Sequence, residues 1–226
     1  MTDRAGLRER KRQRTYDAVS AAAISLFLEH GYDRVSVADI AAATEISKPT
    51  LFRYFRSKED LVLHRFADHE GEPARVVRNR PAHQTPLAAL HGHFLDGLAR
   101  RDPVTGLNDH PEVLAFHHMI FSTASLSARL NEYIARDEEA LADALVETAG
   151  AADTLTARLA AAQIIAVRRV LARENWRRLA AGETAAAVYG PAKASADNAF
   201  QLLTSGLGRL AGGPPEHCRI VLPVIR

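Results

Sequence analysis

The chain has 226 residues, of which 47% are hydrophobic and 25% are charged, and its formal net charge is +2. This much apolar side chain can bury a core, which excludes a wholly disordered protein. The single cysteine, Cys218, excludes an intramolecular disulfide and a cysteine-based metal centre. The polar first residues and the lack of a long uncharged apolar run argue against a signal peptide and a membrane-spanning helix, so the expected location is cytoplasmic.

Alanine, the strongest helix former, is abundant, and runs of β-branched residues are scarce. The sequence therefore predicts an all-α protein of about nine helices. Residues 1–14 carry six basic side chains against two acidic ones. Such a run is either a solvated terminus or a basic arm that binds a polyanion, and the segments that follow it favour the arm.

The segment over 12–44 predicts two helices. Apolar residues recur at a helical spacing as far as His30, and Gly31 is a typical stop signal. Ser36, with an acidic residue three positions later, forms a capping-box pattern that opens a short helix over 37–44.

A second pair of helices follows after a tight turn. Ser47 is a good N-cap, and Pro49 suits a first helical turn because its missing N–H costs nothing there. This helix extends to about residue 55, and a longer one begins near residue 58. Two short helices joined by such a turn predict a helix-turn-helix over about 36–55, whose second helix can enter the major groove of DNA.

The stretch from Lys48 to Lys58, which contains that second helix, reads KPTLFRYFRSK and interleaves four basic residues with three aromatic ones. Leu51 and Phe55, four residues apart, should face the core. Thr50, Arg53 and Tyr54 then face outward. A solvated charged face is the alternative, but an exposed side this aromatic and basic favours a nucleic-acid partner.

These features resemble the DNA-binding domain of the TetR family of repressors over about residues 11–66. The resemblance is carried by Gly31-Tyr32, Ser36 to Ala41, Ile46 to Phe55 and Ser57 to Leu61. Two positions depart from the family pattern. The family usually has glycine where this chain has Glu45, and often has a phosphate-binding tyrosine where it has Phe52. A positive φ at Glu45 would cost on the order of 1 kcal/mol.

The resemblance implies a set of DNA-contacting residues, namely Ser36, Val37, Lys48, Pro49, Thr50, Phe52, Arg53, Tyr54 and Lys58. Contacts near or to phosphate, which fix the register, are implied for Ser36, Val37, Thr50, Tyr54 and Lys58, the last of which otherwise caps its helix. Lys48, Pro49 and Arg53 are the candidates for base edges. Arg53 comes first because a guanidinium pairs bidentately with guanine.

The rest of the chain predicts a second helical domain over 67–211 and a tail over 212–226, after a DNA-binding domain over 1–66. Glycine, proline and polar residues predict a break in the fourth helix near 69–73 and then a loop near 79–86. Further helices are expected over 86–101, from Pro111, from about Ser125 to Gly150, over 153–181, and from Gly190-Pro191 through Leu210. Neither the tail nor Cys218 suggests a function.

The helix over 153–181 is apolar on more than one side, which predicts burial on two faces. One side carries Leu155, Leu159, Ala162, Ala166 and Val170, and another carries Ile164, Val167 and Leu171. The last helix has small residues that permit close approach, at Ala192, Ser195, Ala196, Ala199, Ser205 and Gly206. Packing within one chain is the alternative, but the resemblance to TetR proteins implies a homodimer through the last two helices.

Aromatic, histidine and arginine residues of the second domain are predicted to surround an effector cavity. The candidates are His91, Phe94, Phe116, His117, Phe121, Tyr133, Arg169, Arg173 and Trp176. Plain core packing is the alternative for the aromatic residues. Five arginines between 168 and 178 form either a solvated, ion-paired face or a basic rim for a phosphate-bearing ligand. The region from His110 to the segment after Trp176 loosely resembles TetR-type regulators of acyl-CoA-like ligands.

The expected function is a transcriptional repressor that a small hydrophobic effector, with an acyl-CoA-like molecule as first candidate, releases from a double-stranded DNA operator. A ligand-independent architectural DNA-binding protein is the alternative, and a second domain filled by side chains would favour it. An enzyme is the remote alternative, because no HExxH, GxSxG or phosphate-binding glycine loop is present. No cofactor and no metal are expected.

Overall fold

The computed structural model describes residues 3–67, 69–149 and 153–205, and within these ranges it contains ten α-helices, two short 3-10 helices and no strand. This confirms the all-α prediction. The predicted tail over 212–226, with Cys218, lies outside the described residues. Within the described ranges, no helix combines the length and the hydropathy needed to cross a membrane.

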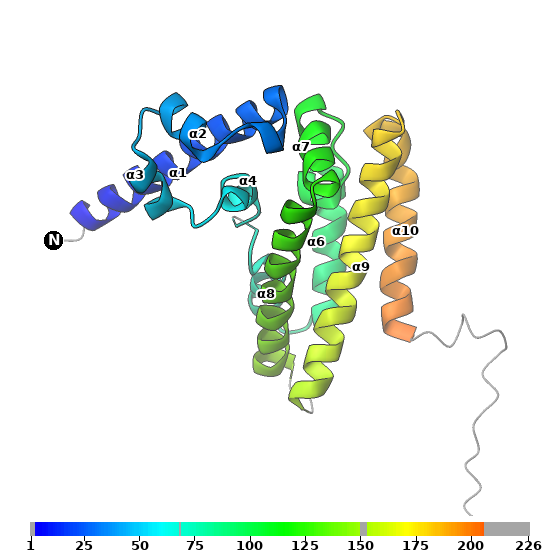
Figure 1. The fold of residues 1–226 in the computed structure, drawn as a ribbon. Helices are drawn as coiled ribbons and strands as arrows, with labels where there is room; N and C mark the ends of the chain where they lie inside the picture. The colour runs from blue at the N-terminus through cyan, green and yellow to red at the C-terminus, as the bar shows by residue number, and fades with distance from the viewer. Residues whose placement is uncertain (1–2, 68, 150–152, 206–226) are drawn as a thin grey trace, which may run out of the picture.

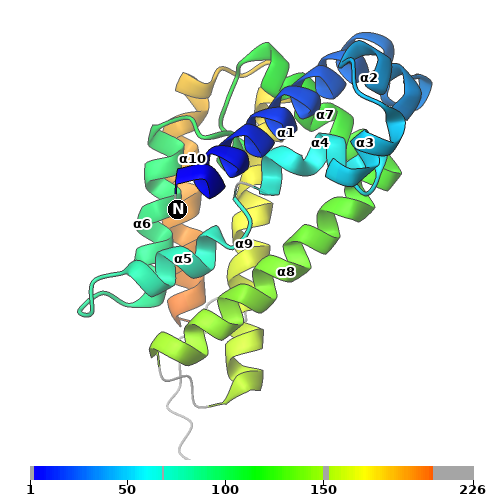
Figure 2. The same cartoon turned by 90° about the vertical axis from the view of Figure 1, so that its left-hand side faces the viewer.

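The first four helices gather at one end of the molecule and form a unit that we call the head (Figure 1). They are α1 (Asp3–His30), α2 (Val37–Ala43), α3 (Lys48–Tyr54) and α4 (Lys58–Ala67), with a 3-10 turn, η1 (Tyr32–Arg34), between α1 and α2. The remaining helices form the body, in which α6, α8, α9 and α10 run along one another. Helix α1 passes in front of the upper part of the body in Figure 2, and Figure 1 shows that its C-terminal end lies beside α7.

The body contains six helices. They are α5 (Glu72–Asn79), α6 (Pro86–Ala99), α7 (Pro111–Ser122), α8 (Ala124–Ala149), α9 (Thr154–Ala180) and α10 (Ala185–Ser205), with a 3-10 turn, η2 (Pro103–Thr105), after α6. The count exceeds the prediction by one because the expected break after α4 is complete. Gly71 adopts a left-handed conformation, with φ of 71°, and a separate helix starts after it. The chain over 58–79 therefore forms two separate helices, α4 and α5.

Local signals set the helix boundaries of the head. Ser36 Oγ accepts a hydrogen bond from the backbone N–H of Asp39 at 3.2 Å, and the Asp39 carboxylate accepts one from the Ser36 N–H at 2.8 Å. Ser47 Oγ accepts from the Thr50 N–H at 3.2 Å. These contacts satisfy N–H groups that have no partner in the first turn of a helix. The predicted capping box and the predicted second N-cap are both confirmed.

Two predicted helix starts are wrong. Helix α1 already begins at Asp3, so the residues expected to form a basic arm extend a helix. Helix α10 begins at Ala185, and Pro191 lies inside it. The start is set by Thr184, whose Oγ1 accepts from the Ala187 N–H at 3.2 Å. Pro191 is tolerated in the second turn because it is exposed, so water can reach the carbonyl that lacks a partner.

The head and the body share part of their packing. The fully buried Ile40, Leu51 and Leu61 of the head belong to one hydrophobic cluster with Ile120 of α7 and Leu126 of α8. A second cluster fills the body between α5, α6, α8, α9 and α10. The head therefore packs directly on the helices that continue into the body.

Candidate DNA-binding helix and effector cavity

Helix α3 presents one outer face to solvent. Leu51 is fully buried and Phe55 is 2% exposed, as predicted, and both anchor the helix in the head. The exposed residues of the helix are Lys48, Pro49, Phe52 and Arg53. Their spacing places them on a single face. The burial of Leu51 and Phe55 thus determines which side chains of this helix point outward.

Two residues expected on that face are only half exposed. The Thr50 hydroxyl hydrogen-bonds the Ser47 hydroxyl at 2.8 Å, and the Tyr54 ring packs edge-on against Tyr16 of α1 at 4.9 Å between centroids. Both residues still lie at the border of the face. Arg53 is exposed and forms no ion pair with any residue in the described ranges. It is the arginine of α3 that remains available to a partner.

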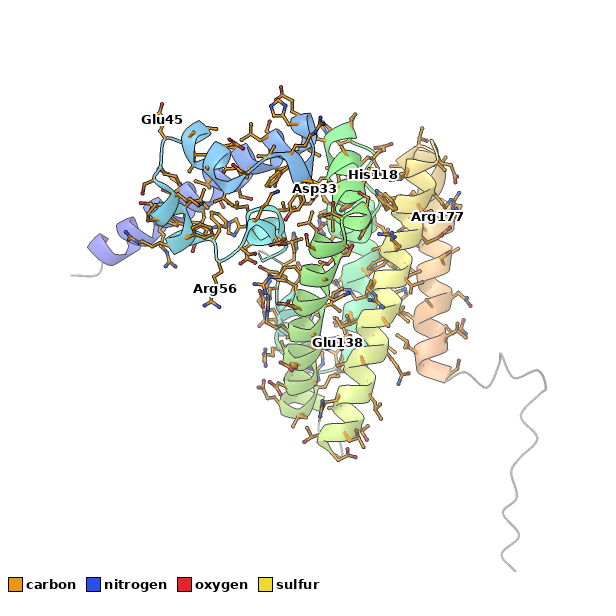
Figure 3. All side chains as sticks on the ribbon, in the orientation of Figure 1. Asp33, Glu45, Arg56, His118, Glu138 and Arg177 are labelled. Carbon is orange, nitrogen blue, oxygen red and sulfur yellow. The ribbon has the colours of Figure 1, made fainter. Side chains whose placement is uncertain are left out.

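The turn before α3 contains the predicted departure from glycine. Glu45 has a φ of 54°, in the left-handed region. In Figure 3 its side chain points away from the body, and Arg56, in the turn after α3, also points into solvent. The unfavourable backbone conformation of Glu45 costs on the order of 1 kcal/mol. Helix α3 and its Ser47 N-cap form nevertheless.

Lys58, for which a phosphate contact or a capping role is expected, makes contacts within the head. Its ammonium group donates a hydrogen bond to the backbone carbonyl of Tyr32 and lies 4.1 Å from the centroid of the Tyr32 ring. It also lies 5.3 Å from the ring centroid of Phe27. Lys58 therefore ties α4 to the turn after α1, and its contact with phosphate stays a prediction. At the start of α2, Ser36 is exposed and Val37 is half-buried.

A cavity of about 570 Å³ lies in the body between α5, α6, α7, α8 and α9. The structure brings seven of the nine predicted ligand residues to its wall, namely Phe94, His117, Phe121, Tyr133, Arg169, Arg173 and Trp176. The Arg173 guanidinium lies 3.5 Å from the Phe121 ring centroid and 4.7 Å from that of Trp176. One side of the cavity is thus a stack of aromatic and cationic groups.

The other two predicted ligand residues lie elsewhere. His91 Nε2 is 2.9 Å from Asp197 Oδ1, and its ring stacks on Phe200 at 4.8 Å, so it joins α6 to α10. Phe116 packs against the hydrophobic cluster of the head. It is the neighbour of His117 on α7, and adjacent residues on a helix point in directions about 100° apart.

The polar side of the cavity combines two predicted residues, His117 and Trp176, with Arg168 and Asp137, which were not among the candidate ligand residues. Buried Nη1 of Arg168, Nε1 of Trp176 and Nδ1 of His117 have no hydrogen-bond partner in the described part of the chain. Burial, together with the nearby Arg173, lowers the pKa of His117 to about 4. Burial also lowers the pKa of Arg168 and raises that of Asp137. An unpaired buried polar group is costly, so these atoms favour a ligand that carries oxygen atoms as well as apolar surface.

The predicted basic rim divides into different environments. Arg177 is paired with Glu174 at 2.8 Å, and Arg178 donates to Glu183 at 2.8 Å. These two arginines therefore fit the ion-paired alternative. Arg168, by contrast, is turned into the cavity wall. Among five arginines on one helix, only the packing distinguishes Arg168, whose Nη1 atom is buried, from the others.

Helix α8 connects the cavity to the head. Arg129 Nε donates to Asp60 of α4 at 2.9 Å, and Arg136 Nε donates to Glu70 at 2.6 Å. A second cavity, of about 410 Å³, lies at this junction. Tyr133 and Glu70 line both cavities. The two cavities therefore share lining residues where the head meets the body.

Helix α9 carries unpartnered apolar side chains on its outer side. Leu155, Leu159 and Val170 are 65%, 54% and 63% exposed, whereas Ile164 and Leu171 are buried. In the single chain one of the two apolar faces is therefore buried and the other is exposed, so burial on both faces stays a prediction that requires a second copy. On α10 the small residues Ala192, Ala196 and Ala199 pack against the hydrophobic cluster of the body. Within the single chain they therefore allow α10 to lie close to its own neighbouring helices. Gly206 lies outside the described residues.

Comparison with known proteins agrees with this arrangement. Residues 19–64, which span most of the head, match the family described as bacterial regulatory proteins, tetR family. The chain is 35% identical over 175 residues to the HTH-type transcriptional regulator TcmR of Streptomyces glaucescens, covering 75% of this chain and 76% of that protein. It is 44% identical over 55 residues to the transcriptional repressor ComR of Escherichia coli, covering 23% and 26%.

Solved structures share the fold at low identity. NalD of Pseudomonas aeruginosa, the secondary repressor of the MexAB-OprM multidrug efflux pump, superposes with a TM-score of 0.53 at 18% identity over 86% of this chain and 96% of that one. FadR of Bacillus subtilis in complex with stearoyl-CoA gives 0.51 at 19% identity over 84% and 98%. Together with the extent and identity of the match to TcmR, these findings show that the chain belongs to the TetR family of bacterial transcriptional regulators.

Proposed function

We propose that the chain is a repressor that binds a palindromic operator through α3 of each subunit of a homodimer and is released by a molecule bound in the larger cavity. The observation that carries this proposal is the route along α8. Tyr133 lines the cavity, and Arg129, one turn earlier, holds Asp60 of the head. A regulator of this kind is not an enzyme. We place the functional boundary between the two domains near residue 66.

The dimer is proposed to form through the outer sides of α9 and α10. The exposed Leu155, Leu159 and Val170 provide an apolar stripe that a second copy would cover. A two-fold axis would place the two α3 helices about 34–36 Å apart, which matches the distance between successive major grooves. In the ligand-bound form this distance would be somewhat larger. Leu159→Glu should give monomers in light scattering at micromolar concentration. Val146→Glu, at an exposed apolar site on α8, is the matched control, and a wild-type monomer would contradict the proposal.

The effector is proposed to be apolar, with an acyl-CoA as the first compound to test. The aromatic wall at Phe94, Phe121 and Trp176 suits an apolar body, and Arg169 and Arg173 are available for an anionic group. A constitutive architectural protein is the weaker candidate, because a cavity of about 570 Å³ is not needed in a domain that only supports DNA binding.

The test is operator binding, followed by fluorescence anisotropy on DNA selected from the parent genome. Arg53→Ala should weaken specific binding by about 1–3 kcal/mol and relax the preference at one base per half-site. An effector should lower operator affinity about 5–150-fold, the range typical of coupled sites. Phe121→Trp should narrow the cavity and reduce this response without loss of DNA binding. If acyl-CoAs, fatty acids and hydrophobic drugs all leave the binding curve unchanged, the constitutive alternative replaces the repressor.

A further inference from the structure

We propose that Phe52 selects a thymine in each operator half-site by packing its ring on the C5-methyl group in the major groove. The proposal rests on the proposed function, which places α3 in that groove. It assigns a specificity role to a residue whose aligned position often contacts phosphate in the family, a contact that needs the hydroxyl group that phenylalanine lacks.

The position of the ring is the first argument. Phe52 is 44% exposed, whereas its neighbours Leu51 and Phe55 are almost completely buried. Within residues 12–64, where the structure describes burial, no other large apolar side chain is this exposed; the comparable residues lie on α8 and α9. A capped helix that holds a bare phenyl ring in solvent has an apolar group left to bury.

The neighbours of the ring give its orientation in a complex. Lys48 precedes Phe52 by four residues and Pro49 by three, so all three share one side of α3. Arg53, next along the chain, is exposed on the same face. Because the two basic residues of the face are available to phosphate or guanine, the ring between them is held against the floor of the groove.

The chemistry of the groove then limits what the ring can recognise. Phenylalanine has no donor or acceptor, so it cannot read the hydrogen-bonding pattern of a base edge. The C5-methyl of thymine is the apolar group that the major groove presents, and contact with it distinguishes thymine from cytosine. Packing on deoxyribose is the competing arrangement, and it would be indifferent to the base.

The test removes one methyl group at a time. Wild-type protein first selects its operator from random DNA, and each thymine of the selected site is then replaced by deoxyuridine, which lacks only the methyl group. At one thymine per half-site the affinity should fall about fourfold, because burying one such group is worth about 0.8 kcal/mol. Replacement in both half-sites should lower it about 15-fold. When the base pair at that position is changed to cytosine–guanine, methylation of the cytosine at C5 should raise the operator affinity about fourfold.

Variants assign the effect to the ring. Phe52→Ala should bind the thymine and deoxyuridine operators equally, and Phe52→Tyr, which keeps the ring, should still discriminate between them. Arg53→Ala should weaken binding yet keep the discrimination at this thymine. Equal thermal unfolding temperatures for wild type and Phe52→Ala would show that the exposed substitution leaves the fold intact.

Three results would overturn the proposal. They are a selected operator without a constant thymine, a wild type that is indifferent to deoxyuridine, and a Phe52→Ala variant that still prefers thymine. Uniform weakening of Phe52→Ala on all of these DNAs would show packing on the sugar instead. If the wild type selects no DNA sequence, the proposed function itself fails, which is a different outcome from a bound operator whose thymine methyls are not read.

Discussion

The head and the body differ in how completely their buried polar groups are paired. In the head, Ser20 Oγ donates to the Leu61 carbonyl at 2.7 Å, and the carboxylate of Asp60 is held by Arg129 at 2.9 Å. In the body, buried nitrogens of His93, His117, Arg168 and Trp176 have no partner in the described ranges. Each such group costs about 1–3 kcal/mol until something pairs with it. The unpaired groups of the body therefore leave stability that a ligand could still supply, whereas the buried polar groups named in the head are already paired.

The sharpest test of this difference is a loss of core volume in each region. Leu51→Ala removes a fully buried side chain from the head and should lower the free energy of unfolding by about 2–5 kcal/mol, measured by urea denaturation. Leu130→Ala, on the half-buried wall of the cavity, should cost clearly less, because space already adjoins that side chain. Equal losses would contradict the view that only the body is loosely filled.

The unpaired His117 predicts an acid sensitivity that belongs to the body. The pKa of His117 is about 4 in the folded protein, against an ordinary value of 6.5. At a pH between 4 and 6.5 this side chain is therefore protonated in the unfolded chain and neutral in the folded one. Stability should therefore be lost as the pH falls from 6.5 to 4, by up to about 3 kcal/mol.

His117→Gln should remove this part of the pH dependence, measured as the difference in unfolding free energy between variant and wild type. His118→Gln, at the exposed neighbouring residue labelled in Figure 3, is the control and should leave the profile as it is in the wild type. A wild-type profile that runs parallel to that of His117→Gln would show that the ring is not held neutral by burial.

Loss of the ion pair between Arg129 of the body and Asp60 of the head should lower stability by an intermediate amount. Arg129→Met leaves the buried Asp60 without its 2.9 Å partner and should destabilise the protein by about 1–3 kcal/mol. It should also reduce the release of DNA by an effector, since α8 would lose a direct hold on α4. Arg78→Met, which breaks an exposed pair between α5 and α8, is the control and should change stability by less than about 1 kcal/mol.

The smallest expected change in stability concerns two residues other than glycine whose backbone is in the left-handed region. Glu45 of the head and Arg101 of the body have φ values of 54° and 57°. Glu45→Gly should stabilise the protein by about 1 kcal/mol, because glycine adopts this conformation without strain.

Arg101→Gly should have the opposite sign. The Arg101 guanidinium donates to the Ala185 carbonyl and lies 5.5 Å from the Tyr189 ring centroid, so the substitution also removes the tie to the start of α10. Thermal unfolding of both variants measures the contrast. Stabilisation by both would show that this tie contributes little.

Much of the head could be predicted from the sequence because its signals act over a few residues. Ser36 meets Asp39, and Ser47 meets Thr50, each across one helical turn. Such contacts depend on residue type and spacing alone. The same holds for the outward direction of Arg53 and the inward direction of Leu51, which follow from helical periodicity.

The tertiary structure decided what depends on residues far apart in the chain. Lys58 turns to Tyr32 across 26 positions, Arg129 reaches Asp60 across 69, and His91 meets Asp197 across 106. The burial of Arg168 among the solvated arginines of α9 belongs to the same class. Periodicity states which side of a helix is apolar, but the partner of each polar group is set by how whole helices pack, because pairing energies arise only once distant segments have come together.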